Sequence, residues 1–157
     1  MLIRRATPED IPQIRTLGEQ SSTAAHWKSE QYDALFASGA PPRIALVAQE
    51  ETEEDEIVGF LVARCLSDEW ELENIVVHEI RKRRGIGTGL LRRLLSEAEA
   101  SGAAGVVLEV RESNASARRL YESIGFTSEG RRQAYYNNPA EDAILYRRSL
   151  QFCDKIP

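Results

Sequence analysis

A glycine-rich segment in the middle of the chain, Arg84-Gly85-Ile86-Gly87-Thr88-Gly89, constrains the fold more than any other stretch. It follows an apolar run at residues 75–77 and precedes a helical pattern of leucines at positions 90, 91, 94 and 95. A strand that turns through glycines into a helix lets unpaired backbone N–H groups approach a ligand closely. Six cations lie in or beside the segment, at positions 81–84, 92 and 93, with no acidic residue between positions 81 and 93. These features predict a site for a polyanionic cofactor.

The spacing of the glycines separates the possible cofactors. A Walker loop ends in Gly-Lys-Ser/Thr, whereas Gly87 is followed by Thr88 and Gly89. A dinucleotide fingerprint places its third glycine three residues after the second, and here the interval is two. The segment therefore favours neither of these sites. A glycine-rich turn in a basic surface, with no ligand, is the alternative interpretation of the loop taken alone.

Composition predicts one globular domain. The 157 residues are 42% apolar and 29% charged, and the net charge of −5 argues against general nucleic-acid binding. No run approaches 18 apolar residues, and the N-terminus has no signal-peptide pattern, so we expect a cytoplasmic protein with no membrane segment. Cys65 and Cys153 are expected to be free thiols. With only two histidines, His26 and His78, we expect no metal site.

Periodicity and turn residues predict the element order β-α-α-β-β-β-α-β-α-β-β, which alone indicates a mixed α/β sheet. Asn114 is expected to cap the last helix, and the acidic run at 50–56 is expected to form an exposed hairpin tip. We expect one domain over residues 1–150 and a C-terminal tail at 151–157. The expected helices begin near residues 7, 29, 87 and 114, and the expected strands cover 2–5, 44–49, 57–65, 70–77 and 106–110, with two antiparallel closing strands from 126 onward and at 143–150.

The motifs resemble those of the GNAT family of N-acetyltransferases. Gly85 and Gly87 match the two glycines of the family's Q/R-x-x-G-x-G/A motif, with Lys82 where Gln or Arg is usual. Residues 108–126 are similar to the family's second signature. Within the family, the segment 131–144, with Arg131-Arg132, Tyr135-Tyr136 and Glu141-Asp142, looks most like bacterial ribosomal-protein-alanine N-acetyltransferases of the RimI type. The resemblance runs from about residue 1 to 150 and is weaker before Glu73.

This resemblance implies a fold and a co-substrate. The fold is a mixed, mostly antiparallel sheet whose parallel fourth and fifth strands splay apart, with helices on both faces. The co-substrate is acetyl-CoA, lying in the cleft between those strands. Asn114 would bind the pantetheine arm in addition to its role as a cap, and Arg81 to Arg84 are better placed for phosphates than Arg92 or Arg93. Backbone groups would contact the pantetheine at Ile75, Val76 and Val77 and the pyrophosphate at Arg83, Arg84, Gly85, Ile86, Gly87 and Thr88.

Glu109 is the candidate general base. Its strand neighbours at 106–110 are all apolar, so we expect a buried carboxylate, and burial favours proton uptake near neutral pH. From the residues alone, a structural glutamate paired with Arg111 or another cation is equally consistent. The match to the family's base position favours the catalytic role.

Tyr121 is the candidate general acid, because a phenol can donate a proton to a departing thiolate. Its spacing relative to Ala117, Leu120 and Ile124 would also suit a core tyrosine, and it is the match to the family's acid position that favours catalysis. Tyr135 and Tyr136 are secondary candidates, expected to line a peptide groove.

The resemblance implies acetyl transfer to the N-terminal alanine of a protein, with a small-subunit ribosomal protein as the expected partner. Transfer would be direct, within a ternary complex, so no covalent nucleophile is needed. The same chemistry on a small-molecule amine is the alternative, because a fold does not fix the substrate. A non-catalytic acyl-CoA sensor is a more remote alternative, against which the presence of Glu109 and Tyr121 argues.

Overall fold

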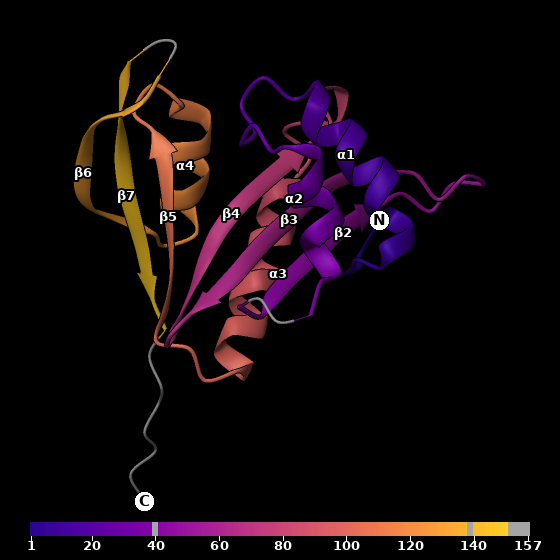
Figure 1. The fold of residues 1–157 in the computed structure, drawn as a ribbon, viewed down its shortest axis with the longest axis horizontal. Helices are drawn as coiled ribbons and strands as arrows, with labels where there is room; N and C mark the ends of the chain where they lie inside the picture. Colours follow the sequence, from indigo (N-terminus) through magenta and orange to yellow (C-terminus); the bar gives the residue numbers. More distant parts are fainter. Residues whose placement is uncertain (39–40, 138–139, 151–157) are drawn as a thin grey trace, which may run out of the picture.

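The computed structural model describes residues 1–38, 41–137 and 140–150, so the expected tail at 151–157 and Cys153 lie outside the described residues. One sheet has the strand order β1-β2-β3-β4-β5-β7-β6, in which only β4 and β5 are parallel neighbours (Figure 1). The predicted mixed, mostly antiparallel sheet is therefore confirmed. The strands are β1 (Leu2–Arg5), β2 (Arg43–Gln49), β3 (Ile57–Leu66), β4 (Glu69–Val77), β5 (Gly105–Arg111), β6 (Thr127–Tyr136) and β7 (Glu141–Ser149).

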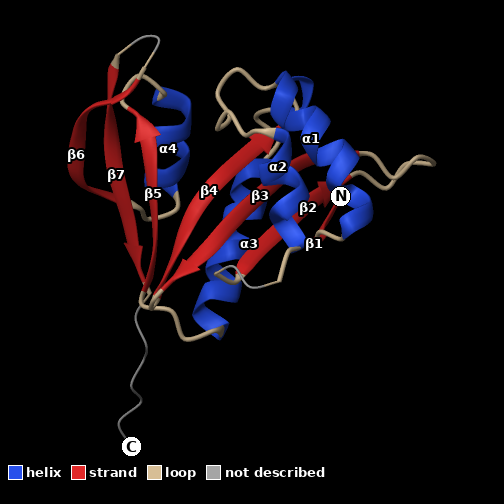
Figure 2. Cartoon of the chain, in the orientation of Figure 1, coloured by secondary structure: helices blue, strands red, loops and turns tan. Residues whose placement is uncertain are grey.

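Helices cover both faces of the sheet, as expected. α1 (Ile11–Gln20) and α2 (Ser29–Asp33) lie on one face, and α3 (Ile86–Ala100) and α4 (Ala115–Ser123) lie on the other (Figure 2). The described part also contains short 3-10 turns at Pro8–Asp10, Ala34–Phe36 and Glu79–Arg81. None of the helices in the described ranges combines the length and the hydropathy needed to cross a bilayer.

Each face of the sheet has its own core. The apolar face of α3, which includes Leu90, Leu91 and Leu94, packs on one face with no exposed surface on these side chains. On the other face, Ile14 of α1 and Tyr32 of α2 pack against the opposite side chains of β2 and β3. This two-sided burial explains why β2 and β3 are almost continuously apolar, instead of alternating.

A β-bulge at Glu73 changes which face the side chains of β4 point to. Val62 of β3 pairs with Asn74, but the next residue, Ala63, pairs with Leu72, so Glu73 is the extra residue. Before the bulge, Leu72 packs in the core under α3; after it, Val76 packs in the core under α1. The bulge therefore turns Asn74 toward the α1 face.

The parallel strands separate soon after they begin. β4 and β5 pair only from Glu69 with Gly105 to Glu71 with Val107. Beyond this point the two strands diverge into the V-shaped opening seen in Figure 1. The edge of β4 that faces β5 at Ile75–Val77 therefore has no strand partner. The splay that the family resemblance implied is confirmed.

The buried carboxylate of Asp10 links the 3-10 turn before α1 to strand β1. The Asp10 carboxylate accepts two hydrogen bonds from the Arg4 guanidinium, at 2.8 and 2.9 Å, and one from the Thr7 backbone N–H at 2.7 Å. Burial alone would raise the pKa of Asp10, but these hydrogen bonds outweigh it and hold the pKa below its usual value. Asp10 therefore stabilises the fold above the usual carboxyl pKa, and this contribution is lost as the pH falls through the lower pKa of the folded state.

We expect Asp10→Asn to lower the free energy of unfolding by about 2 kcal/mol at pH 7, because it removes a charged acceptor of three hydrogen bonds. The difference from wild type should shrink below about pH 4, where the unfolded chain takes up a proton at Asp10, and vanish below the lower pKa of the folded state. Urea denaturation across this pH range measures both effects. Asp33→Asn is the control, because the Asp33 side chain is 66% exposed in its pair with Arg15. A loss that is equal at all pH values would contradict the role of the Asp10 charge.

Candidate active site

The glycine segment forms the start of α3 at the mouth of the opening between β4 and β5. Gly85 precedes the helix with a φ of 79°, in the left-handed region that favours glycine. The first helical hydrogen bond joins the Gly89 N–H to the Gly85 carbonyl. The N–H groups of Ile86, Gly87 and Thr88 therefore have no helical acceptor, and they are suited to bind an anion.

Gly87 allows α3 to approach α4 closely. A Cβ atom at Gly87 would lie 3.1 Å from Leu120 Cδ2. The start of α3 and the middle of α4 therefore lie side by side, and Tyr121 follows Leu120 in that helix. Because Gly87 has no side chain, the candidate anion site at the start of α3 lies close to the helix that carries the candidate acid.

The cations at this site differ in their availability. Arg83 and Arg84 are exposed and form no ion pair with any residue in the described ranges. Arg81, in contrast, is 2.9 Å from the Glu50 carboxylate at the end of β2, and Lys82 is 2.8 Å from Glu79. The Arg81 guanidinium is thus paired with the acidic β2–β3 hairpin, and its expected contact with phosphates stays a prediction. 

Arg92 and Arg93 agree with the expectation that they are less well placed for phosphates than the cations before the glycine segment. Arg93 pairs with Glu97 one turn later on α3, and Arg92 is exposed. Both therefore belong to the outer face of that helix.

The expected pantetheine contacts lie along the opening. Ile75, Val76 and Val77 form the last part of β4, where the edge toward β5 is unpaired. Across the opening, the Asn114 side chain accepts a hydrogen bond from the Ala117 N–H at 3.2 Å. Its predicted role as the cap of α4 is confirmed, and its contact with a cofactor stays a prediction.

Glu109 differs from its expected environment. The alternation of β5 buries Val106, Leu108 and Val110 against the α3 and α4 side, so Glu109 projects from the opposite face. Its side chain is 27% exposed, and its carboxylate lies 3.1 Å from Arg132 Nε on β6. The expected deep burial is therefore wrong, because the apolar neighbours in sequence point to the other face of the strand. The ion pair that was foreseen as an alternative is formed, with Arg132 as the cation.

Tyr121 is a buried residue on the other face of β5. Its ring packs beside Phe126 and Tyr146, with ring centroids at 5.9 and 6.2 Å. Burial raises the pKa of the Tyr121 hydroxyl well above its usual value, and the nearby Tyr136 raises it further. Among the described residues, no hydrogen-bond partner is found for this hydroxyl. It is therefore protonated at neutral pH and available as a donor.

Tyr136 lies close enough to interact with both the candidate base, Glu109, and the candidate acid, Tyr121. Partial burial raises the pKa of Tyr136, and the Glu109 carboxylate raises it further. Tyr136 in turn raises the pKa of Tyr121, so its phenol is near enough to interact with both groups. The Arg111 guanidinium lies 4.3 Å from the centre of the Tyr136 ring. The structure thus keeps Tyr136 at the candidate site, whereas Tyr135 is exposed at the rim.

Asn74, which follows the β4 bulge, is a buried polar residue that the sequence patterns did not single out. Its side chain is buried, and Oδ1 accepts a hydrogen bond from the Ala25 N–H at 3.3 Å. Its Nδ2 is buried without a hydrogen-bond partner among the described residues. A polar residue between apolar positions of a strand was the available signal, but the face it occupies depends on the bulge.

The structure offers no metal centre in the residues it describes. No group of three or more His, Cys, Asp or Glu side chains there is arranged to hold an ion. Cys65 is a partly exposed free thiol on β3.

Together, the splayed parallel strands and the free N–H groups at the start of α3 define an α/β protein with an anion-binding helix start beside the opening of its sheet. The chain belongs to the acetyltransferase (GNAT) family, whose sequence profile matches residues 11–126. Members of this family use acetyl-CoA.

Similarity to individual proteins agrees with this assignment. The chain is 41% identical over 96 residues to the [ribosomal protein bS18]-alanine N-acetyltransferase of Escherichia coli, which covers 60% of this chain and 65% of that protein. The match thus spans slightly less than two thirds of the curated relative. The crystal structure of the E. coli ribosomal-protein-S18-alanine N-acetyltransferase superposes with a TM-score of 0.81 at 28% identity, over 99% of this chain and 97% of that chain.

A more distant structure shares the fold alone. Arabidopsis thaliana NAA60, solved in complex with acetyl-CoA, superposes with a TM-score of 0.82 at 19% identity, over 95% of this chain and 98% of that chain.

Proposed function

We propose that this protein is an acetyl-CoA-dependent N-acetyltransferase that acts on the N-terminal α-amine of a protein, with alanine as the first residue. The observation on which this proposal rests is the opening between β4 and β5, which has the Glu109 carboxylate on one face of β5 and the Tyr121 phenol on the other. An acetyl group held in that opening would meet an acceptor on the Glu109 face, while the leaving sulfur would remain on the Tyr121 face.

The residues around the opening suit acetyl-CoA. The free N–H groups at 86–88 and the exposed Arg83 and Arg84 offer donors and positive charge to a pyrophosphate. The unpaired edge of β4 at 75–77 can pair with the amides of a pantetheine arm, as an added strand would. No metal is needed in this arrangement.

The proposed reaction follows from these positions. When bound, acetyl-CoA supplies a thioester whose carbonyl carbon is the electrophile. Glu109 takes the first proton that the ammonium group of the acceptor must lose, directly or through one water molecule, and later releases it to solvent. As the new C–N bond forms and the C–S bond breaks, the Tyr121 hydroxyl donates its proton, or a hydrogen bond, to the departing sulfur. The nitrogen loses its second proton as it becomes an amide, and this proton returns through water to Tyr121 where the phenol gave up its own. Both groups act as proton carriers, and no covalent enzyme intermediate is required.

The similarity to the E. coli bS18-alanine enzyme supports a small-subunit ribosomal protein as the acceptor. The net charge of −5 would attract a basic peptide of this kind. A ribosomal acceptor implies a cytoplasmic location for the reaction.

The test uses mass spectrometry on two matched basic peptides incubated with acetyl-CoA. One peptide has a free alanine N-terminus, and the other has a blocked N-terminus and an internal lysine. We expect an added acetyl group on the first peptide alone, because the α-amine loses its proton more easily than the lysine amine. Acetylation of the lysine peptide would contradict the α-amine assignment.

A negative result on both peptides is also informative. If isothermal titration shows that acetyl-CoA binds while neither peptide is modified, the protein-acceptor proposal fails. A screen of small amines with the same protein then tests the alternative acceptor class. Absence of acetyl-CoA binding would refute the proposed cofactor itself.

A further inference from the structure

Strand β6 contains an irregular segment directly after Arg132. Arg132 pairs with Ala143 of β7, and the next paired residue of β6 is Tyr136, opposite Glu141. Three residues of β6 therefore oppose a single residue of β7. Within the segment, Ala134 has a φ of 50°, which is uncommon for a residue with a side chain. Bulges of this kind redirect side chains near functional sites.

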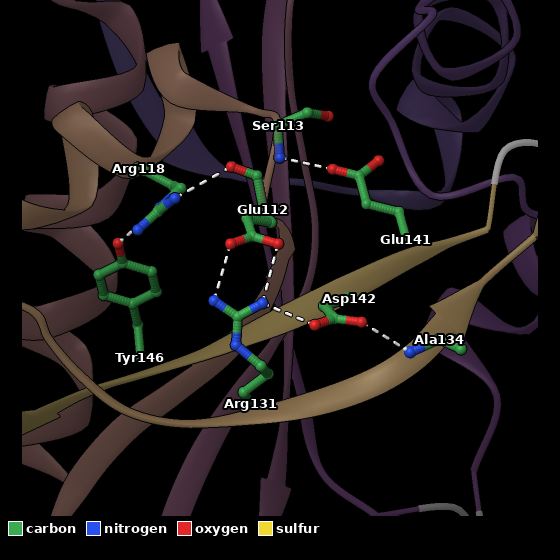
Figure 3. A network of polar contacts seen from close by, with 8 residues as sticks. All are labelled: Glu112, Ser113, Arg118, Arg131, Ala134, Glu141, Asp142 and Tyr146. Atoms are coloured by element: carbon green, nitrogen blue, oxygen red, sulfur yellow. Dashed lines mark hydrogen bonds and ion pairs between the residues drawn. The ribbon is translucent and has the colours of Figure 1, made fainter.

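A network of charges holds the segment in place (Figure 3). The Asp142 carboxylate accepts a hydrogen bond from the Ala134 N–H at 2.8 Å and pairs with Arg131 at 2.6 Å. Arg131 also pairs with Glu112, at 2.7 Å, in the loop between β5 and α4. The residue before Arg132 and the residue two positions after it are thus both fixed to neighbouring elements.

The result is that Arg132 reaches Glu109 from the neighbouring hairpin. Its Nε lies 3.1 Å from Glu109 Oε1, although the Arg132 side chain is 57% exposed. The guanidinium also lies 5.3 Å from the centre of the Tyr135 ring. The pair is therefore exposed to solvent, on the face of β5 that carries the candidate base.

The other charged groups near Glu109 have partners of their own. Strand alternation and register place Arg111, Arg147 and Glu71 on the same face of the sheet as Glu109, close to it in the strand pairing. Tyr136 is a fourth titratable side chain that interacts with the Glu109 carboxylate. These groups and their contacts are Arg111 with Glu141, Arg147 with Glu69, Glu71 with Arg64, and Tyr136 beneath the Arg111 guanidinium.

We propose that Arg132 is a positioning residue that holds the Glu109 carboxylate in the free protein and yields its place to the ammonium group of the acceptor. The inference rests on the proposed role of Glu109 as the base. The guanidinium occupies a carboxylate to which a cationic amine is also attracted. An ion pair this exposed is weak, so an incoming ammonium group can displace it at little cost. Arg132 thereby holds the carboxylate in place until a cationic acceptor replaces it.

The experiment compares Arg132→Gln and Arg132→Lys with the wild-type protein. Arg5→Gln is the matched control, because Arg5 is a 60% exposed arginine paired with Glu97 at the opposite end of the sheet. For each protein, kcat and KM for the alanine peptide are measured across a pH series, together with the affinity for acetyl-CoA.

For Arg132→Gln, we expect KM for the acceptor to fall about two- to fivefold at neutral pH, because the competing cation is gone. kcat should stay within about twofold of the wild-type value, because Arg132 has already left the carboxylate once the acceptor is bound. Arg132→Lys should restore most of the wild-type profile. Arg5→Gln and the affinity for acetyl-CoA should be unchanged.

Two results would overturn the proposal. An unchanged KM would show that Arg132 does not compete with the acceptor for Glu109, and a raised KM would show that it binds the acceptor instead. A failure of the proposed function is seen separately, as absence of turnover by the wild-type protein. In that case the NMR chemical shift of the Glu109 side-chain carboxyl decides, because it should change in Arg132→Gln and not in Arg5→Gln. An unchanged chemical shift would then refute the inference.

Discussion

Replacing Glu109 with glutamine should lower kcat/KM for an alanine peptide by about 100-fold at pH 7, the lower range for loss of a general base. The carboxamide has nearly the same shape but cannot take a proton from the acceptor. Because an α-amine has a pKa near 8, the loss should be largest at low pH and should shrink toward about pH 9, where the amine is already neutral. Steady-state kinetics across this range measure both the size and the pH dependence of the effect.

Two controls make this result specific. Acetyl-CoA affinity should be unchanged, because Glu109 lies on the face of β5 opposite Tyr121. Glu129→Gln, on β6, changes the same functional group at a position where the side chain is 55% exposed and 3.9 Å from Arg147. It should leave the kinetics as they are. An unchanged pH–rate profile in Glu109→Gln would exclude Glu109 as the base.

The second large effect is expected for Tyr121→Phe, which should lower kcat about 10- to 100-fold. The substitution removes only the hydroxyl, so the ring contacts with Phe126 and Tyr146 are retained and the fold should be stable. Since burial raises the pKa of Tyr121, the group holds its proton at neutral pH and stabilises the departing thiolate mainly as a hydrogen-bond donor. Single-turnover kinetics with saturating acetyl-CoA measure the chemical step.

Tyr32→Phe is the matched control, because Tyr32 is also a buried tyrosine but packs in the core on the opposite face of the sheet. It should leave kcat unchanged. Full activity of Tyr121→Phe would make Tyr121 a structural residue, and Tyr136, which interacts with both Glu109 and Tyr121, would become the candidate acid.

Local sequence patterns were sufficient for most elements of this fold. The strand at Leu2–Arg5 has the predicted boundaries, and the observed start of α3 at Ile86 is one residue from its predicted start. The cap at Asn114 and the glycine turn at Gly85 were also predicted, because both depend on residues within one turn of the chain. The acidic run at 50–56 forms the exposed hairpin tip that its composition indicated.

Contacts between distant segments could not be predicted in the same way. The apolar sequence around Glu109 suggested burial, but in a strand successive side chains point to opposite faces, and Arg132 arrives from another hairpin. Likewise, Arg81 is near the glycine segment in sequence, yet its guanidinium pairs with Glu50, in the loop after β2. In both cases a partner far away in the chain decides what the side chain can do.

The sequence by itself thus determined the order of the elements and the glycine turn, because periodicity, capping and turn chemistry act over a few residues. The candidate base and acid came from the match of their positions to the family's motifs. The tertiary structure decided where β4 and β5 part after Glu71, which face each candidate occupies, and which cation meets Glu109. These features depend on strand register, on the one-residue bulge in β4, which exchanges the two faces of the strand, and on the irregular segment of β6.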